Sequence, residues 1–177
     1  MKYCLSILLF CVSMHCSFAQ GQGRASIGAE VGFPTGSGTD GVGTGFGGSF
    51  RYEKGTKNKN INWLISGGYL SFPLNASSSG ATASGTASFV PFLFGMKYYA
   101  IESFTGFYLG SDIGVTIITE KVTFSYAGFS GTASASENKF TFSPGIGYHF
   151  RGADLGFRYN LLSDANYLGI RLGVMLN

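Results

Sequence analysis

The sequence predicts an all-β fold, an eight-stranded antiparallel transmembrane β-barrel, and three observations lead to it. Glycine makes up 28 of the 177 residues and aromatic residues 16%, whereas charged residues make up only 12%. Apolar and small or polar residues alternate along most of the chain with the period of 2 that is typical of a β-strand with two different faces. The charged residues within these segments fall on one face only.

Residues 1–19 form a separate segment with the features of a cleaved signal peptide. Lys2 supplies a positive start, residues 5–12 are apolar, and residues 17–19 provide a small-x-small cleavage site. The apolar run is too short to span a bilayer as a helix. All three cysteines of the chain lie in this segment. The mature outer-membrane β-barrel domain, 20–177, is therefore expected to contain no disulfide.

Period-2 alternation in the mature domain defines eight segments, most of them about 10 residues long, as a tilted strand needs to cross a bilayer. They are 24–33, 42–52, 61–72, 87–99, 105–118, 139–150, 154–162 and 167–176. In the first and second segments, Glu30 and Arg51 share a face with the glycines. The third segment is the least regular, because Leu64 and Leu70 interrupt its alternation.

The five later segments alternate more clearly. In the fourth and fifth, Lys97 and Asp112 lie opposite a face of large apolar residues. The sixth has one apolar face, with Phe140, Phe142, Pro144, Ile146, Tyr148 and Phe150. Arg158 and Arg171 take the glycine-rich face of the seventh and eighth. All five segments therefore have the two-faced pattern of a strand between two environments.

The connections differ in length between the two ends of the predicted strands. Residues 53–60 form a charged turn and 151–153 a tight one, whereas 75–86 and 119–138 are long and rich in Ser, Ala, Gly and Thr. Short turns at one rim and long loops at the other are typical of transmembrane barrels. With both termini in the periplasm, the long loops face the outside.

The charged residues indicate which environment each face meets. We assign the two faces of each strand, that is, the parity of its residue numbers, from the apolar residues alone. This assignment places six charged residues on the glycine-rich face: Glu30, Arg51, Lys97, Asp112, Arg158 and Arg171. In a soluble, lipocalin-like ligand-binding barrel that face would meet water, where so many glycines would weaken the strands. In a membrane barrel the apolar face meets lipid, and glycine, serine and paired charges fit the narrow interior. The sequence therefore favours the membrane barrel.

Aromatic residues near the strand ends favour the same interpretation. They form two expected interface girdles, with Tyr52, Trp63, Tyr98, Tyr148 and Phe150 on the short-turn side and Phe33, Tyr69 and Tyr159 on the other.

Four segments carry a resemblance to a known family: 92-FLFGMKYY-99, 107-FYLGSDIGV-115, 144-PGIGYHF-150 and 168-LGIRLGVML-176. With them, residues 24–176 resemble the small eight-stranded outer-membrane β-barrels of the OmpA and OmpX type, the outer membrane protein β-barrel domain of porin-family proteins. The resemblance implies the fold far more than any activity. One feature departs from it, since such chains commonly end in an aromatic residue and this one ends in Asn177.

No motif for catalysis, a cofactor or a metal emerges from the mature sequence. Its one histidine, His149, falls inward at the periplasmic end of the sixth segment, on the rim opposite to a hydrolytic triad at the outer surface. One histidine without cysteine argues against a transition-metal site. The glycines of 43–48 are not followed by a helix, so they are no phosphate loop. We therefore expect no enzyme activity, no cofactor, and no catalytic, cofactor-binding or metal residue.

The six inward charges are the candidate site. Glu30 and Asp112 would face four cations across the lumen, and closure of the barrel would bring Glu30 beside Arg171. Unpaired charges in a dry interior are costly, so pairing or trapped water is expected. The structural interpretation is a lumen charge network, and the functional alternative is a polar permeation path.

These features predict a small non-enzymatic barrel of the bacterial outer membrane with a structural or surface-interaction role, such as adhesion or partner binding. Its partners would be outer-membrane lipid and an extracellular or envelope protein that contacts loops 73–86 and 119–138. No nucleic acid is expected, because the densest basic group, Lys54 to Lys59, sits in a turn. The alternatives are a narrow channel or porin-like passage for small solutes and an outer-membrane lipid-modifying enzyme.

Overall fold

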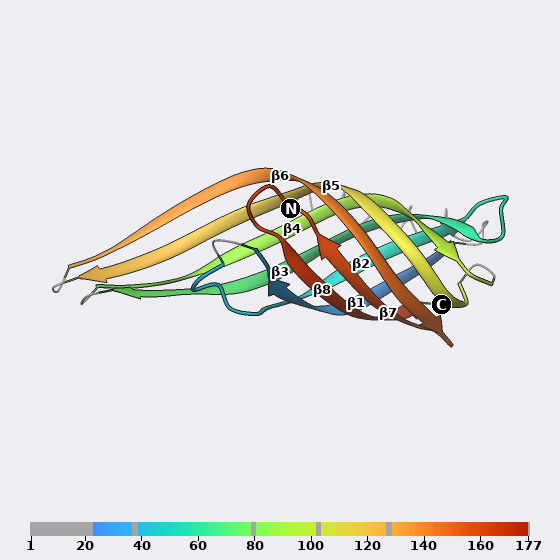
Figure 1. The fold of residues 1–177 in the computed structure, drawn as a ribbon, viewed down its shortest axis with the longest axis horizontal. Coiled ribbons are helices and arrows are strands. Elements are labelled where there is room, and N and C mark those ends of the chain that lie inside the picture. Colours follow the sequence, from blue (N-terminus) through green and yellow to red (C-terminus); the bar gives the residue numbers. More distant parts are fainter. Residues whose placement is uncertain (1–22, 37–38, 79–80, 102–103, 127–128, 177) are drawn as a thin grey trace, which may run out of the picture.

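The computed structural model describes residues 23–36, 39–78, 81–101, 104–126 and 129–176. Within them, eight antiparallel strands follow one another around a closed barrel (Figure 1). The strands are β1 (Gly23–Pro34), β2 (Gly45–Gly55), β3 (Ile61–Ser78), β4 (Ala81–Tyr99), β5 (Gly106–Tyr126), β6 (Phe129–Phe150), β7 (Ala153–Asn160) and β8 (Tyr167–Leu176). The predicted fold class is confirmed. The signal peptide predicted at 1–19 lies outside the described residues and stays a prediction.

Pairing of the first strand with the last closes the barrel. β1 and β8 are antiparallel from Ala25↔Leu176 to Pro34↔Tyr167, and this register places Glu30 opposite Arg171. Inside the barrel wall each strand therefore has a neighbour on both sides, so its backbone N–H and C=O groups are paired, as hydrocarbon requires. The described part of the chain contains no helix long and apolar enough to cross a membrane.

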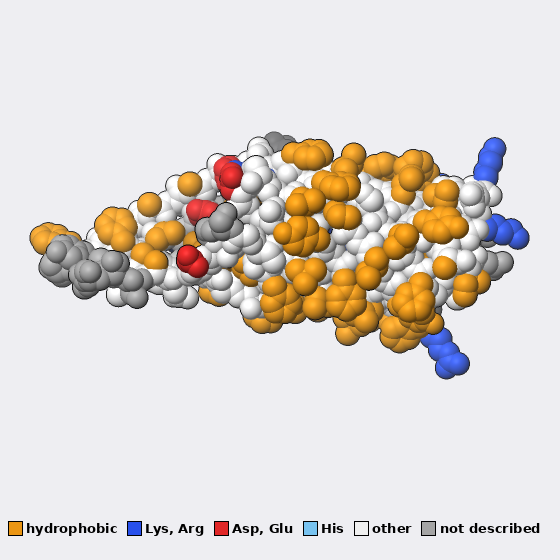
Figure 2. Space-filling view, viewed as in Figure 1, with side chains coloured by type: hydrophobic (Ala, Val, Ile, Leu, Met, Phe, Trp, Pro, Cys, Tyr) orange, Lys and Arg blue, Asp and Glu red, His pale blue; other side chains and the backbone are white. Residues whose placement is uncertain are grey.

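The outer wall of the barrel is apolar. Large side chains with the predicted outward parity are exposed on all eight strands, among them Ile27, Phe50, Ile65, Phe94, Leu109, Ile146, Phe157 and Leu172. They form an apolar band over the barrel in Figure 2. Trp63 and Tyr98 lie exposed toward the short-turn end, and Tyr69 and Tyr159 toward the other end. This surface is suited to hydrocarbon flanked by two interfaces.

Short turns join the strands at one end of the barrel, the short-turn end. Arg151 and Gly152 connect β6 to β7, and both have positive φ angles, 36° and 88°, as a two-residue hairpin turn requires. Between β2 and β3 the turn is shorter than the predicted 53–60, because β2 continues to Gly55. Glu53 therefore belongs to a strand, and its side chain is buried.

The described residues of the two segments predicted as long loops, 73–86 and 119–138, belong to paired strands instead, and that prediction was wrong. β3, β4, β5 and β6 continue outward beyond the barrel as two hairpins, which also pair with each other as far as Ala81↔Tyr126. Figure 1 shows this extension projecting to the left. We call it the blade, and it consists of residues 73–78 of β3, 81–88 of β4, 119–126 of β5 and 129–138 of β6.

The blade forms because its small residues also alternate at period 2. On one face, rows of hydroxyls lie across the strands: Thr123 Oγ1 is 3.2 Å from Thr132 Oγ1, and Thr119 Oγ1 is 3.1 Å from Ser136 Oγ. Cross-strand hydroxyl pairs of this kind stabilise a sheet. The register places small and apolar residues on the other face, among them Ala83, Gly85, Val122, Phe124 and Ala133. Because alanine and glycine carry little hydrophobicity, the sequence of the blade has the composition of a loop.

The outer half of the barrel interior is filled by an apolar cluster, which we call the outer plug: Leu70, Phe72, Ala87, Phe89, Ile118, Leu162 and Tyr167. The rings of Phe72 and Phe89 lie 4.8 Å apart, and that of Phe72 lies 5.5 Å from Tyr167. Leu64 and Leu70, which interrupt the alternation of β3 in sequence, both point inward and are buried. Both faces of β3 therefore carry apolar residues, although one packs inside the barrel and the other forms part of the outer wall.

Candidate functional site

The inner half of the barrel contains the predicted charges. Glu30, Arg51, Lys97, Asp112, Arg158 and Arg171 are all buried, none more than 8% exposed. Glu53 and Asp154 are also buried, at 3% and 0%. Among the described residues, four cations and four carboxylates thus share the lumen, and their formal charges balance. We call these eight side chains the lumen network.

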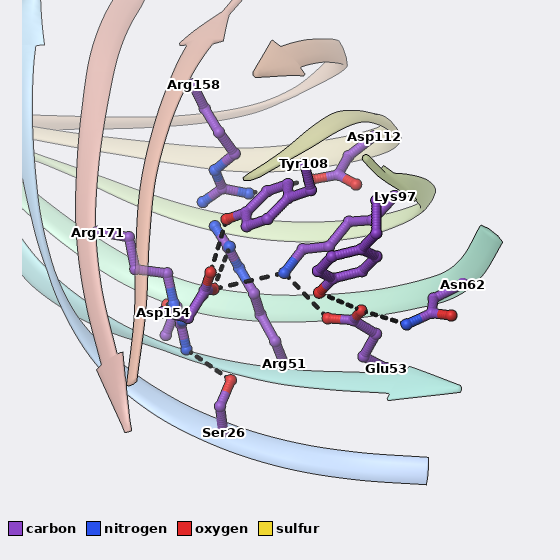
Figure 3. Close-up of polar contacts among 12 residues, drawn as sticks. Ser26, Arg51, Glu53, Asn62, Lys97, Tyr108, Asp112, Asp154, Arg158 and Arg171 are labelled. Carbon is purple, nitrogen blue, oxygen red and sulfur yellow. Dashed lines mark hydrogen bonds and ion pairs between the residues drawn. The ribbon is translucent and has the colours of Figure 1, made fainter. Parts of the chain in front are cut away.

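Asp154 at the start of β7 is the centre of the lumen network (Figure 3). Its Oδ2 lies 3.1 Å from Arg171 Nη1, 3.4 Å from Arg51 Nη1 and 3.5 Å from Lys97 Nζ. Its Oδ1 accepts a hydrogen bond of 2.7 Å from the Tyr108 hydroxyl. One carboxylate from β7 therefore joins cations from β2, β4 and β8, so it ties opposite walls of the barrel together.

A second carboxylate, Glu30, lies one level further out. Its Oε1 accepts hydrogen bonds from Arg158 Nη2 at 2.8 Å and from the Ser49 hydroxyl at 2.7 Å. Arg158 also reaches Asp112, with Nη1 3.3 Å from Oδ2. This part of the network therefore links β1, β2, β5 and β7.

The third level lies nearest the short-turn end, around Glu53. Its Oε2 is 2.9 Å from Lys97 Nζ. Its Oε1 accepts hydrogen bonds from Asn62 Nδ2 at 2.7 Å and from the Tyr99 hydroxyl at 2.6 Å. Lys97 therefore bridges Glu53 and Asp154 (Figure 3). Arg51, which contacts Asp154, also lies 3.6 Å from Glu30, measured from Nη2 to Oε1, so all three levels form one connected network.

Inward glycines provide the room that these long side chains need. A Cβ atom on Gly28 would lie 2.8 Å from the guanidinium of Arg171, and one on Gly173 would overlap the same group. A Cβ on Gly156 would lie 2.9 Å from the Tyr108 hydroxyl. The high glycine content on the inner face thus makes room for charged side chains in a barrel of only eight strands.

Little open space remains in the lumen around these side chains. A cavity of about 10 Å³ lies between Arg51, Lys97, Tyr108 and Asp112, which is room for about one water molecule. Asp112 Oδ1 and Arg51 Nε have no hydrogen-bond partner among the described protein atoms. Among the described residues, the buried side chains of the lumen network and of the outer plug lie at successive levels of the interior.

His149 lies inside the barrel near the short-turn end, because it is the last inward residue of β6 before the turn to β7. It is buried, and its ring lies 6.4 Å from those of Tyr99 and Phe104. Neither ring nitrogen has a hydrogen-bond partner among the residues that the structure describes. No group of His, Cys, Asp and Glu in the described ranges could hold a metal ion.

Two members of the network, Glu53 and Asp154, were missed from sequence. Glu53 shares parity with Arg51 two residues earlier, and Asp154 shares parity with Arg158. Glu53 was assigned to a turn, and Asp154 stands at the first position of its predicted segment, where parity is easily overlooked. The same period-2 rule would have found both.

Comparisons with known proteins agree with this architecture. No protein-family model matches the chain, and no curated protein matches it. Among solved structures, Ail, the attachment invasion locus protein of Yersinia pestis, is similar with a TM-score of 0.58 and 18% identity, over 88% of this chain and 97% of that one. Neisserial surface protein A (TM-score 0.41, 12% identity, 88% and 96% covered) and the N-terminal β-barrel domain of Pseudomonas aeruginosa OprF (0.42, 15%, 89% and 100%) also match. The chain has the fold of the small eight-stranded outer-membrane β-barrels.

Proposed function

We propose that this protein is a non-enzymatic barrel of the bacterial outer membrane that carries an interaction surface, the blade, outside the cell. The observation that supports this function is the blade itself, which extends four of the eight strands beyond the apolar band. The lumen network has a structural role in this account. The network joins the walls of the barrel and so stabilises the strands that continue into the blade.

The two ends of the barrel differ in charge and in the length of their connections. Arg24, Lys54, Lys57 and Arg151 are exposed at the short-turn end, whereas acidic side chains gather where the blade leaves the barrel (Figure 2). Between these two ends, the outer wall presents an apolar band to its surroundings. A barrel that crosses the membrane at this band has its short turns in the periplasm and the blade on the cell surface.

One edge of the blade can accept another strand. β6 pairs with β7 only from Gly145 to Phe150, and an isolated bridge joins Phe142 to Leu161. Within the described residues, β6 therefore has a strand partner on only one side from Phe129 to Thr141. An unpaired edge exposes N–H and C=O groups to which an extended segment of a partner can add. The Yersinia pestis protein is named for attachment, and an attachment role fits such an edge.

A shortened barrel tests the proposal. Replacement of 74–85 and of 120–135 by Asn-Gly turns joins residues that already face each other, Pro73 to Thr86 and Thr119 to Ser136. Bacteria that carry the full chain should attach to surfaces coated with extracellular-matrix protein more than bacteria without it. The shortened variant should fold, which heat-modifiable gel mobility reports, and should attach no better than the bacteria without the protein. Attachment equal to that of the full chain would refute a role of the blade.

A further inference from the structure

A pocket opens at the outer mouth of the barrel, between the outer plug and the base of the blade. Its volume is about 110 Å³. Its wall is apolar and comes mainly from Val42, Phe72, Leu74, Phe89 and Tyr167, and two carboxylates, Glu120 and Asp164, lie at its rim. An engineered apolar cavity of about 150 Å³ takes up benzene, so this pocket has room for one amino-acid side chain.

The strand register places Glu120 over this wall. Its cross-strand neighbours are Ala87 on β4 and Ala135 on β6, both too small to cover the carboxylate. Asp164 comes from the connection between β7 and β8. That connection is held in place because the Asn166 side chain accepts a hydrogen bond of 2.8 Å from the Leu162 N–H, and the Asn166 carbonyl accepts one of 2.9 Å from the Thr35 N–H.

Negative charge exceeds positive charge around the pocket. Lys139 Nζ lies 3.1 Å from Asp164 Oδ2 and 3.1 Å from Glu137 Oε2, so one ammonium group serves two carboxylates. Glu120 makes no hydrogen bond or ion pair among the described residues. Apolar walls below an uncompensated carboxylate match a side chain that has an aliphatic stem and a cationic end.

We propose that this pocket binds a lysine or arginine side chain of a partner protein, with the methylene stem against Phe72, Leu74 and Phe89 and the cation between Glu120 and Asp164. Long basic side chains bury their stems on apolar surface while the charge stays at the rim in this way. The inference rests on the proposed function, since it names the chemistry that the cell-surface end of the barrel recognises.

The pocket also discriminates between side chains. An acidic side chain meets Glu120 and Asp164 with like charge. A purely apolar side chain fills the pocket but leaves the Glu120 carboxylate without a counter-charge, whereas Asp164 keeps its ion pair with Lys139. Binding should therefore require a positive charge, and it should weaken as salt rises, because both carboxylates are solvent-exposed.

The experiment uses the folded full-length mature barrel in detergent micelles, with the methyl groups of Val42 and Leu74 observed by NMR. The probes are N-acetyl-lysine methylamide and N-acetyl-norleucine methylamide, which share the aliphatic stem but differ in charge. We expect saturable shifts with the lysine derivative and markedly weaker binding of the norleucine derivative. No saturation with the lysine derivative, or equal affinity for the two probes, would overturn the proposal.

Adjacent residues on β5 provide a matched pair of variants. Glu120→Gln should weaken lysine binding about two- to fivefold, the range for one solvent-exposed ion pair. Lys121 pairs with Thr86 and Ser134 on the hydroxyl face of the blade, so Lys121→Gln should leave the affinity unchanged. Equal effects of the two variants would refute the site. If lysine binding fails while the blade-dependent attachment of bacteria persists, only this inference is wrong and the proposed function stands.

Discussion

The guanidinium of Arg171 lies 3.1 Å from the carboxylate of Asp154, measured from Nη1 to Oδ2. The β1–β8 register places Arg171 opposite Glu30, yet the shortest distance between those two groups, Nε to Oε1, is 3.8 Å. The side chain of Arg171 thus reaches past its cross-strand neighbour to the centre of the lumen network. The stability of the barrel should depend on this centre more than on any cross-strand charge pair.

Asp154→Asn should lower the free energy of unfolding by about 3–5 kcal/mol, because it leaves buried cations without their shared counter-charge. Urea unfolding of the barrel in lipid vesicles measures this change. Asp40→Asn is the control, since Asp40 is an exposed loop carboxylate, and its free energy of unfolding should match that of the unmodified protein. Equal stability of the two variants would show that Asp154 does not hold the network together.

A double-mutant cycle compares the two possible partners of Arg171. Because Arg171 lies nearer to Asp154 than to Glu30, Arg171→Gln should couple more strongly to Asp154→Asn than to Glu30→Gln. Coupling energies in such networks are about 0.5–3 kcal/mol. From sequence alone we would expect Glu30 to be the coupled residue, so a larger coupling to Glu30 would favour the cross-strand pairing over the network geometry.

The outward position of Ile170 can be tested with a charge. Ile170→Arg places a cation against hydrocarbon and should impair folding into bilayers by about 2–4 kcal/mol if the residue lies near the midplane. Ile170→Leu keeps the apolar surface and should fold as the unmodified protein does. Folding of the arginine variant at the unmodified level would mean that β8 is shifted by one residue, which would exchange its lipid and lumen faces.

The purified barrel should not conduct like an open porin. The lumen network and the outer plug occupy the interior at successive levels, and open pores use about 16–18 strands. Planar-bilayer recordings should show no large, long-lived openings. Stable openings on the nanosiemens scale would support the channel alternative and contradict the packing of the lumen.

Period-2 parity was sufficient to predict the fold class and the inward placement of all six predicted charges, because a side chain in a strand can take only two directions. The rule failed where apolar and polar residues contrast little and where the strand boundaries are hard to place. In the blade, Ser and Thr alternate with Ala and Gly, which differ little from them in hydrophobicity. The segment therefore has the composition of a loop and shows no clear apolar face. Glu53 and Asp154 lie at strand ends, where boundaries are hardest to place.

The outer plug could not be predicted for a different reason. Leu70 and Phe72 are apolar residues on the inner face of β3, and in sequence they cannot be distinguished from residues that face lipid. Only the three-dimensional packing of Phe72 with Phe89 and Tyr167 separates the two environments. The pocket at the outer mouth could not be predicted for the same reason, because β1, β3, β4, β5, β8 and two connections all contribute residues to it.

Labelling of single cysteines tests the orientation of the blade most directly. The chain has no cysteine after residue 16, so Ser134→Cys in the blade and Lys57→Cys in the β2–β3 turn each create a unique thiol in the mature domain. A membrane-impermeant maleimide should label Ser134→Cys on intact cells, and it should label Lys57→Cys only after the outer membrane is permeabilised. Labelling of Lys57→Cys on intact cells, with Ser134→Cys protected until permeabilisation, would contradict a barrel that presents its blade outside the cell.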